Sequence, residues 1–186
     1  MPRRLALSFL AMVLALVATA AAQQGRGFSA APADERSVYT DDDVRRPQPR
    51  DSQLGEIEAM EMQCFNEVNR LRVAHGLNPL AFNEDLQRVA RDYSRRMAEE
   101  KFFSHNDPNG NTVRERVTDA HIRWRVLGEN LAYSNGYMNP VAVSLTGWLD
   151  SPGHRRNLLD QMWRQTAIGV WISANGTVYF TEIFMV

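Results

Sequence analysis

The sequence predicts an α+β domain in which several helices come first and a pair of antiparallel strands comes last. From Gln53 onward, apolar residues recur at steps of three and four, which is typical of one face of a helix. The end of the chain is rich in β-branched and aromatic residues and is interrupted at Asn175-Gly176. An Asn-Gly pair between two such runs favours a β-hairpin, so we expect an antiparallel sheet whose faces are covered by helices.

The other expected helices have recognisable start signals. Asn83 is a suitable N-cap for a second helix, and Pro140 suits the first position of a third. A short helix is expected from Thr112 to Val117. Four arginines follow the outer face of the second helix and are interpreted as an ordinary solvated surface: Arg88, Arg91, Arg95 and Arg96.

The first 22 residues have the pattern of a secretory signal. Arg3 and Arg4 precede an apolar run, and small residues continue to Ala22 as at an A-x-A cleavage site. We therefore expect residues 1–22 to be a signal peptide and the protein to be secreted or held in the periplasm or cell envelope. Retention as an uncleaved anchor is the alternative. No later segment is apolar enough to span a bilayer, so no transmembrane segment is expected after cleavage.

Residues 23–52 have the composition of a disordered linker, and residues 53–186 that of one globular domain. The linker is rich in Gly, Pro, Asp and Arg and has no helical or strand period. The chain is 44% hydrophobic and carries a formal net charge of −1, which does not favour a nucleic-acid partner. Its basic residues are almost all arginine, with Lys101 the only lysine.

Cys64 is the only cysteine, so the domain contains no intramolecular disulfide. It lies on the apolar face of the first helix, which favours a buried structural thiol over a reactive or intermolecular one. The fold must therefore be stabilised by packing, and we expect a monomer.

The stretch WLDSPGHRRN, which starts at Trp148, points to a functional site. Ser151 and Pro152 form a favourable helix start, with a hydroxyl N-cap followed by proline at the first position. His154 is then the third helical residue, where the positive end of the helix dipole favours a neutral imidazole. A neutral imidazole can serve as a metal ligand or a base. The alternative is that His154 only caps the helix and packs against Trp148.

Two further polar side chains are placed beside a turn or in an apolar stretch. His105 stands between the end of the second helix and a turn at Asp107–Gly110. Glu129 lies in the apolar stretch GENLAY and needs a hydrogen-bond donor if it is buried. We expect His105, Glu129 and His154 to converge, either around Zn²⁺ or a similar divalent cation with open positions, or as a base with its orienting acid. The compact motifs H-E-x-x-H, C-x-x-C and G-x-S-x-G are absent.

Five stretches occur in one order along the chain: NEVNRLRVAHGLNPL, FSHNDPNG, GENLAY, WLDSPGHRRN and GVWISANGTVYFTEIF. Together they resemble the CAP superfamily of cysteine-rich secretory proteins, antigen 5 and pathogenesis-related 1 proteins, in its cysteine-poor bacterial SCP-like form. The resemblance covers about residues 53–186. It implies a three-layer α-β-α sandwich with a central antiparallel sheet and a cleft lined by His and Glu side chains.

The resemblance also assigns residues to that cleft. The two cleft histidines of the family match His105 and His154, and the acid of its GEN motif matches Glu129. Asn69 and Arg72 match a first-helix motif that we expect to be structural.

Several positions depart from the family pattern. Many members have a second cleft glutamate where this chain has Ser151, with Asp150 beside it. Glu182 replaces a usual strand glutamine. We expect it to be exposed because strand faces alternate, and the alternative is a second acid near the cleft. His75 and His121 match no cleft motif and are expected on the surface.

Two functions are compatible with these residues. The first is a secreted protein whose cleft binds a divalent cation, a small lipid, glycan or peptide ligand, or both. The alternative is a peptidase-like or cell-envelope hydrolase that uses His154 and Glu129 with Ser151 or a metal-bound water. We favour binding, because a serine that caps a helix directs its hydroxyl at the backbone.

Overall fold

The computed structural model describes residues 49–186, with side chains from Gln53 onward. The predictions of a signal peptide at residues 1–22 and of a linker at residues 23–48 lie outside the described residues. Residues 49–52, which the sequence analysis placed in the linker, belong instead to the first described helix, which begins at Pro49.

Five helices and four strands make up the described part of the chain. The helices are α2 (Pro49–Ala74), α3 (Glu84–Glu99), α4 (Val113–Asp119), α5 (Pro140–Asp150) and α6 (Pro152–Leu159), and the strands are β1 (Ala81–Phe82), β2 (Leu127–Ser134), β3 (Gln165–Ile172) and β4 (Val178–Met185). The predicted start signals are confirmed: Asn83 caps α3 by accepting from the Leu86 amide at 2.9 Å, and Pro140 opens α5.

The strands form one sheet in the order β1-β3-β4-β2. The predicted C-terminal hairpin is confirmed, with β3 and β4 antiparallel, and β2 adds an antiparallel strand on the other side of β4. The sheet is nevertheless mixed, because the two-residue β1 pairs with β3 in parallel. Sequence reasoning missed β1 because a two-residue strand has no period. In this order β2 is an edge strand.

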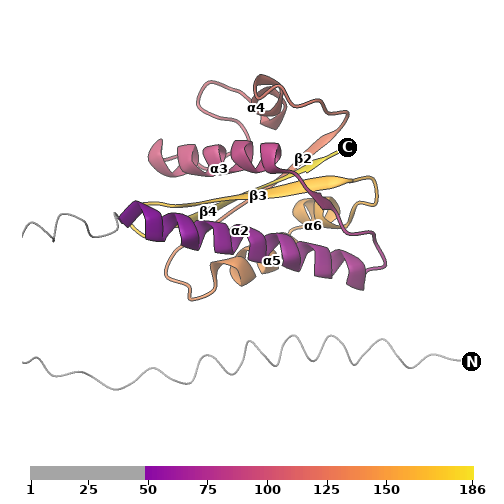
Figure 1. Ribbon diagram of the computed structural model, residues 1–186, viewed down its shortest axis with the longest axis horizontal. Helices are drawn as coiled ribbons and strands as arrows, with labels where there is room; N and C mark the ends of the chain where they lie inside the picture. Colours follow the sequence, from indigo (N-terminus) through magenta and orange to yellow (C-terminus); the bar gives the residue numbers. More distant parts are fainter. Residues whose placement is uncertain (1–48) are drawn as a thin grey trace, which may run out of the picture. The chain divides into compact units, whose positions relative to one another are not determined.

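The helices cover both faces of the sheet, as a three-layer α-β-α sandwich requires (Figure 1). Helices α3 and α4 lie on one face, while α2, α5 and α6 lie on the other. Side chains of β3 and β4 alternate between the two layers: Phe180 and Phe184 pack with the α2 core, whereas Ile183 packs with the α3 core. Within residues 49–186, no helix combines the length and hydrophobicity needed to cross a membrane.

Helix α3 packs directly against β3 at Gly169. A Cβ atom built on Gly169 would stand 1.9 Å from the backbone nitrogen of Arg91 and 2.1 Å from the carbonyl carbon of Ala90. The Ser94 hydroxyl donates to the Gly169 carbonyl at 2.9 Å across this contact. The absence of a side chain at Gly169 therefore sets how closely α3 approaches the sheet.

Two arginines of α3 correct the expectation of a uniformly solvated face. Arg91 forms an ion pair with Glu61 of α2, whose side chain is completely buried and also accepts from the Val170 amide at 3.0 Å. Arg96 donates to the buried carboxylate of Asp107 at 2.9 Å. The charge pattern alone could not show this, because the carboxylates that bind these arginines come from distant segments.

Cys64 is completely buried, as predicted from its place on the apolar face of α2. Burial raises the pKa of its thiol well above the ordinary value, and the nearby Glu182 and Glu67 raise it further. The described residues offer Cys64 no disulfide partner, because it is the only cysteine of the chain.

Glu182 corrects the expectation of an exposed strand residue, since its side chain is completely buried in β4. Thr166 Oγ1 lies 3.4 Å from its Oε1, and its Oε2 has no hydrogen-bond partner among the described residues. Burial raises the pKa of Glu182 to about 8, and contacts with Thr166, Asn130 and Arg72 only partly oppose this. Side chains on both faces of β4 are buried here, because helices cover both sides of the sheet.

We predict that Gly169→Ala destabilises the domain by about 2–3 kcal/mol, because the methyl group must displace the backbone of α3. The matched control is Gly55→Ala in α2, where a Cβ meets nothing within 4 Å. This control should stabilise the domain by up to about 1 kcal/mol through helix propensity. Urea unfolding measures both, and equal stabilities for the two variants would contradict the tight contact.

We also predict a pH dependence that originates at Glu182. The folded pKa of about 8 exceeds the ordinary glutamate value of 4.5, so the folded state holds the proton while the unfolded state releases it. Stability should therefore fall as the pH rises from 4.5 to about 8, by up to roughly 1.4 kcal/mol per pH unit. Glu182→Gln should flatten this slope in urea unfolding between pH 5 and 8. An unchanged slope would show that other groups cause it.

Candidate functional site

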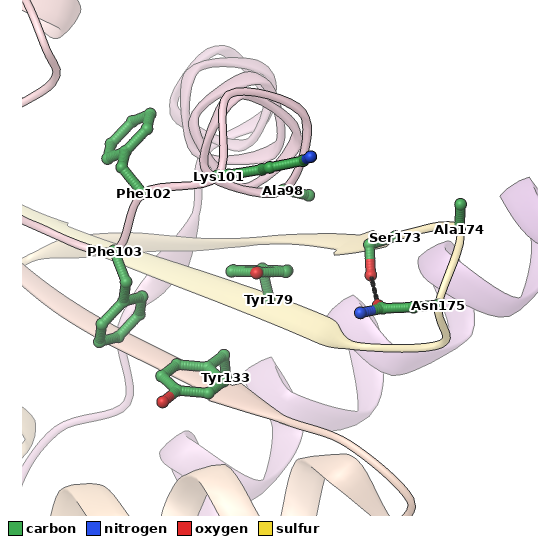
Figure 2. A pocket seen from close by; sticks show the side chains of 9 residues that line it. All are labelled: Ala98, Lys101, Phe102, Phe103, Tyr133, Ser173, Ala174, Asn175 and Tyr179. Carbon is green, nitrogen blue, oxygen red and sulfur yellow. Dashed lines mark hydrogen bonds between the residues drawn. The ribbon is translucent and has the colours of Figure 1, made fainter.

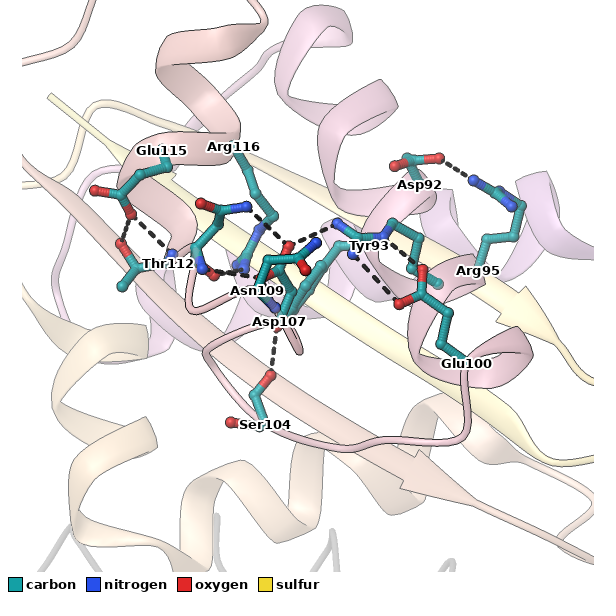
Figure 3. Close-up of polar contacts among 12 residues, drawn as sticks. Asp92, Tyr93, Arg95, Glu100, Ser104, Asp107, Asn109, Thr112, Glu115 and Arg116 are labelled. Atoms are coloured by element: carbon teal, nitrogen blue, oxygen red, sulfur yellow. Dashed lines mark hydrogen bonds and ion pairs between the residues drawn. The ribbon is translucent and has the colours of Figure 1, made fainter.

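A hydrogen-bonded loop after α3 carries His105. The Tyr93 hydroxyl donates to the Ser104 carbonyl at 2.6 Å, and Asp107 Oδ1 accepts from the amides of Asn109 and Asn111, each at 2.9 Å. Figure 3 shows this network around Asp107. Burial raises the pKa of Asp107, but hydrogen bonds from Asn111, Arg96 and Asn109 outweigh it and lower the pKa to about 2. The predicted turn is thus stabilised by several hydrogen bonds directly beside His105.

Glu129 binds two partners from different segments, and both of its oxygens are used. His105 Nδ1 donates to Glu129 Oε1 at 2.8 Å, and Arg116 of α4 forms an ion pair with Oε2. The Glu129 side chain is only 3% exposed, and the Arg116 side chain 7%. The buried carboxylate therefore has the donors that the sequence analysis required, one of them being the expected imidazole.

Sequence reasoning missed Arg116 and Tyr93. The Arg116 guanidinium lies 3.3 Å from the centroid of the Tyr93 ring, and its Nη1 donates to the His105 carbonyl at 3.1 Å. Burial is the main cause that raises the pKa of Tyr93 to about 12. The available signal was the T-x-x-E sequence at Thr112, a capping box that starts α4 and thereby fixes the direction of Arg116.

His154 reaches the same region from α6, across the edge strand β2. Its ring centroid lies 6.4 Å from that of His105, with the two rings tilted by 56°. Burial lowers the pKa of His154 below its ordinary 6.5, and the neighbouring His105 lowers it further. His154 also lines a cavity of about 280 Å³ together with Trp148 and Leu131. The ring thus borders both His105 and an apolar cavity.

Helix α6 is fixed to the sheet and to α2 by side-chain hydrogen bonds to backbone atoms. Asn130 donates to the His154 carbonyl at 3.3 Å, and Asn157 donates to the Glu129 carbonyl at 3.1 Å. Arg72 donates to the carbonyls of Leu158 at 2.7 Å and Asp160 at 3.0 Å. Arg72 therefore makes the structural contacts that the family resemblance implies.

The other residues named from the sequence lie outside this arrangement. Asn69 exchanges two hydrogen bonds with the backbone of Leu80, at 2.7 and 3.0 Å. His75 and His121 are exposed. Ser151 occupies the N-cap position of α6, but its hydroxyl makes no capping hydrogen bond, which corrects the sequence interpretation. Pro152, at the next position, has no N–H that could be capped. The N–H groups of the residues after Pro152 could be capped, but the Ser151 hydroxyl does not accept from them.

The three predicted site residues are close together but do not form a three-ligand cage. Glu129 is directed at His105 and Arg116, and the described hydrogen bonds do not connect it with His154 or Ser151. Among the described residues, no group of three or more His, Cys, Asp or Glu side chains is arranged to hold a metal ion. What the structure brings together is a pair of imidazoles, one of them oriented by a buried carboxylate.

The family model for the cysteine-rich secretory protein family, CAP, matches residues 65–184. The chain belongs to the CAP family. A CAP domain with this fold was expected from the five sequence stretches, and the match confirms it. The matched range includes His105, Glu129 and His154.

Two Bacillus subtilis proteins are similar to this CAP domain. The uncharacterized membrane protein YlbC is 34% identical over 125 residues, which cover 67% of this chain and 34% of YlbC. The uncharacterized protein YkwD is 30% identical over 123 residues, which cover 66% of this chain and 46% of YkwD. The chain thus spans between a third and a half of the length of these relatives.

Solved structures show the same fold. An extracellular SCP-domain protein of Bacillus anthracis has a TM-score of 0.65 and 28% identity, covering 75% of this chain and 44% of that one. An outer surface protein of Borrelia burgdorferi has a TM-score of 0.59 and 21% identity. This match covers 65% of this chain and 87% of that one. The second likeness concerns the fold alone.

We predict that Arg116→Met destabilises this CAP domain by about 3 kcal/mol or more, because it leaves the buried Glu129 with one partner instead of two. The control is Arg88→Met, which removes an exposed ion pair with Asp85 and should cost less than about 0.5 kcal/mol. Thermal unfolding compares the two variants. A loss at Arg116 no larger than that at Arg88 would refute the importance of the buried pair.

Proposed function

We propose that this CAP domain is a secreted binding protein whose cleft takes up a divalent cation, such as Zn²⁺, between His105 and His154. The observation that carries the proposal is the 6.4 Å separation of the two ring centroids. Two imidazoles that share an ion at about 2 Å from each nitrogen have centroids roughly 5 to 6.5 Å apart. The observed separation is at the upper end of this range, so the two rings must approach each other by about 1 Å for the tetrahedral angle that Zn²⁺ prefers.

Glu129 supports this pair as the residue that orients His105. A carboxylate that accepts from Nδ1–H fixes the tautomer of the ring and leaves Nε2 with its lone pair. In metal sites such a carboxylate also makes the imidazole a better ligand. Because both oxygens of Glu129 already have partners, we assign it this positioning role and not the ligand role that the sequence suggested.

The protonation of His154 also favours binding of a cation. Burial lowers the pKa of this imidazole, and so does the nearby His105. The neutral form, which a metal requires, therefore persists to a lower pH than in an ordinary histidine. An ion held by two imidazoles keeps open positions, which can accept an oxygen of a ligand.

The cavity beside His154 supplies an apolar contact for such a ligand. It measures about 280 Å³ and is lined mainly by apolar side chains, including Trp148, Leu131 and Val143. The Ser144 hydroxyl in this lining is buried and has no hydrogen-bond partner among the described residues. We propose that a small ligand presents an oxygen to the ion, an apolar group to this cavity, and a polar atom to Ser144.

The location outside the cytoplasm is supported by the N-terminal pattern of residues 1–22. The Bacillus anthracis protein with this fold is described as extracellular. The hydrolase alternative has less support. Within the described residues, no hydrogen bond joins Ser151 to His154, and Glu129 orients the other histidine.

The test is Zn²⁺ titration by calorimetry on folded, untagged protein at pH 7. We expect one ion per chain, and His105→Ala or His154→Ala should each weaken binding by roughly a hundredfold or more. Glu129→Gln removes the charge that orients His105 and pairs with Arg116, so it should weaken binding by roughly ten- to a hundredfold in protein confirmed to be folded. His75→Ala is the matched control, because His75 is exposed and lies outside the site. Uptake by the wild type should fall as the pH drops through the lowered pKa of His154, because a protonated imidazole cannot bind the ion.

Binding that survives both cleft-histidine substitutions, or that is lost equally in His75→Ala, would rule the site out. Ser151→Ala separates the two functions. The binding proposal expects unchanged ion uptake and little change in stability, because the Ser151 hydroxyl makes no capping hydrogen bond. Turnover of a peptide or cell-wall substrate that disappears in this folded variant would instead establish a hydrolase.

A further inference from the structure

A second cavity, of about 570 Å³, lies between the end of α3, the strand β2 and the β3–β4 hairpin. We call it the aromatic groove and define it by six of its lining residues: Lys101, Phe103, Tyr133, Ser173, Asn175 and Tyr179. Figure 2 shows these side chains around the hollow. Phe103 and Tyr133 also border the cavity beside His154, but none of the six residues would hold the cation proposed above.

Three aromatic rings form a continuous surface in the groove. Phe103 and Tyr133 meet edge to face with centroids 4.8 Å apart, and Tyr133 stacks on Tyr179 with centroids 5.9 Å apart and planes at 27°. Phe103 is 45% exposed and Tyr133 58% exposed. Large contiguous apolar patches on a protein surface are typical of binding sites. The rings present electron-rich faces, which attract the weakly positive C–H groups of a polar ligand.

Lys101 is held at the rim in an unfavourable backbone conformation. It follows the last residues of α3 with a φ of 59°, a left-handed position that normally favours glycine. A side chain at such a position costs about 1 kcal/mol. Lys101 is the only lysine of the chain, and it forms no ion pair with any described residue. Its ammonium is thus available to an anionic ligand, and the strain is consistent with a functional reason for having a side chain here.

The rim of the groove also carries uncharged polar groups. The Ser173 hydroxyl donates to Asn175 Oδ1 at 2.6 Å, which fixes the orientation of the Asn175 amide. The amide nitrogen of Asn175 makes no hydrogen bond within the described residues. Flat aromatic faces bordered by an amide donor and a cation are complementary to sugar rings that bear hydroxyl and carboxylate groups.

We propose that the aromatic groove binds a glycan that carries carboxylate groups. Its sugar rings stack on Tyr133 and Phe103, the Asn175 amide donates to a hydroxyl or carbonyl oxygen, and Lys101 pairs with a carboxylate. The net charge of the chain is −1, so attraction of the anion depends on this local cation and not on the overall charge. The proposal is independent of the cation site, because it uses neither of the two cleft histidines.

An extended peptide is a less suitable occupant. A peptide that adds to a sheet needs free backbone groups on an edge strand. On β2, however, the carbonyl of Leu131 accepts from the Trp148 indole at 2.9 Å, and that of Glu129 accepts from Asn157 at 3.1 Å. Two of the carbonyls that a peptide would need along this edge are therefore already occupied. A lipid chain is also less suitable, because the rim consists of Lys101, Ser173 and Asn175.

The test measures binding of a hyaluronan tetrasaccharide, whose glucuronates carry the anion, and of the neutral, fully N-acetylated chitotetraose. Microscale thermophoresis at low salt should show saturable binding of both, with hyaluronan bound more tightly. Tyr133→Ala should weaken both by roughly fivefold to tenfold, because it removes the stacking surface. Tyr137→Ala is the matched control, since Tyr137 is 59% exposed but does not line the groove.

Lys101→Gly separates the functional role of the lysine from a structural one. Glycine suits the left-handed conformation, so the variant should fold at least as stably as the wild type. It should nevertheless reduce the affinity for hyaluronan to that for chitotetraose, and Lys101→Arg should preserve the difference. The preference for hyaluronan should also disappear at about 1 M salt.

Three outcomes would overturn the proposal: no saturable binding of either oligosaccharide, equal losses in the Tyr133 and Tyr137 variants, or unchanged discrimination in Lys101→Gly. Binding of a glutamate-rich peptide or of phosphatidylglycerol vesicles, with the same dependence on Tyr133 and Lys101 and without glycan binding, would assign the groove to that partner instead. His105→Ala with His154→Ala should leave hyaluronan binding intact, so the two sites can fail separately.

Discussion

The buried carboxylate of Glu129 is the interaction on which the arrangement of the site depends. Removing a charge from water is costly unless its hydrogen-bonding capacity is satisfied. Here one partner comes from the loop after α3 and the other from α4, so the carboxylate connects three segments. The turn at Asp107 lies beside His105, and the capping box at Thr112 starts the helix that carries Arg116. Each of these two local features therefore positions a segment that donates to Glu129. His105 owes its orientation to this satisfied charge.

The edge strand β2 connects that network to the opposite layer of the sandwich. Its side chains alternate between the two layers, while its free backbone edge accepts hydrogen bonds from Trp148 of α5 and Asn157 of α6. The same strand thus fixes Glu129 on one face and the helix that carries His154 on the other. The two imidazoles meet although they come from different layers, and both the proposed cation site and the aromatic groove lie along this one edge.

The features that could be predicted from the sequence have local causes. The Asn83 cap, the proline at the start of α5 and the Asn175-Gly176 turn each act within a few residues, and the structure contains all three elements. Arg116 was missed because it lies 13 residues from Glu129, and its direction depends on how α4 packs. The burial of Glu182 was missed for a related reason, since strand periodicity cannot show that both faces of the sheet are covered. Ser151 shows that a cap position can be predicted without its hydrogen bond.

The junction between α5 and α6 is a single residue, since Ser151 ends one helix and precedes the other. There is no spare chain to absorb a change in length. Because Ser151 is extended, one residue inserted here would lengthen the junction by up to about 3.5 Å and displace the start of α6. Such an insertion would move His154 away from Trp148, which lies only a few residues before it. In the evolution of this domain, length variation should therefore collect in other loops, while this junction keeps its register and allows only substitutions.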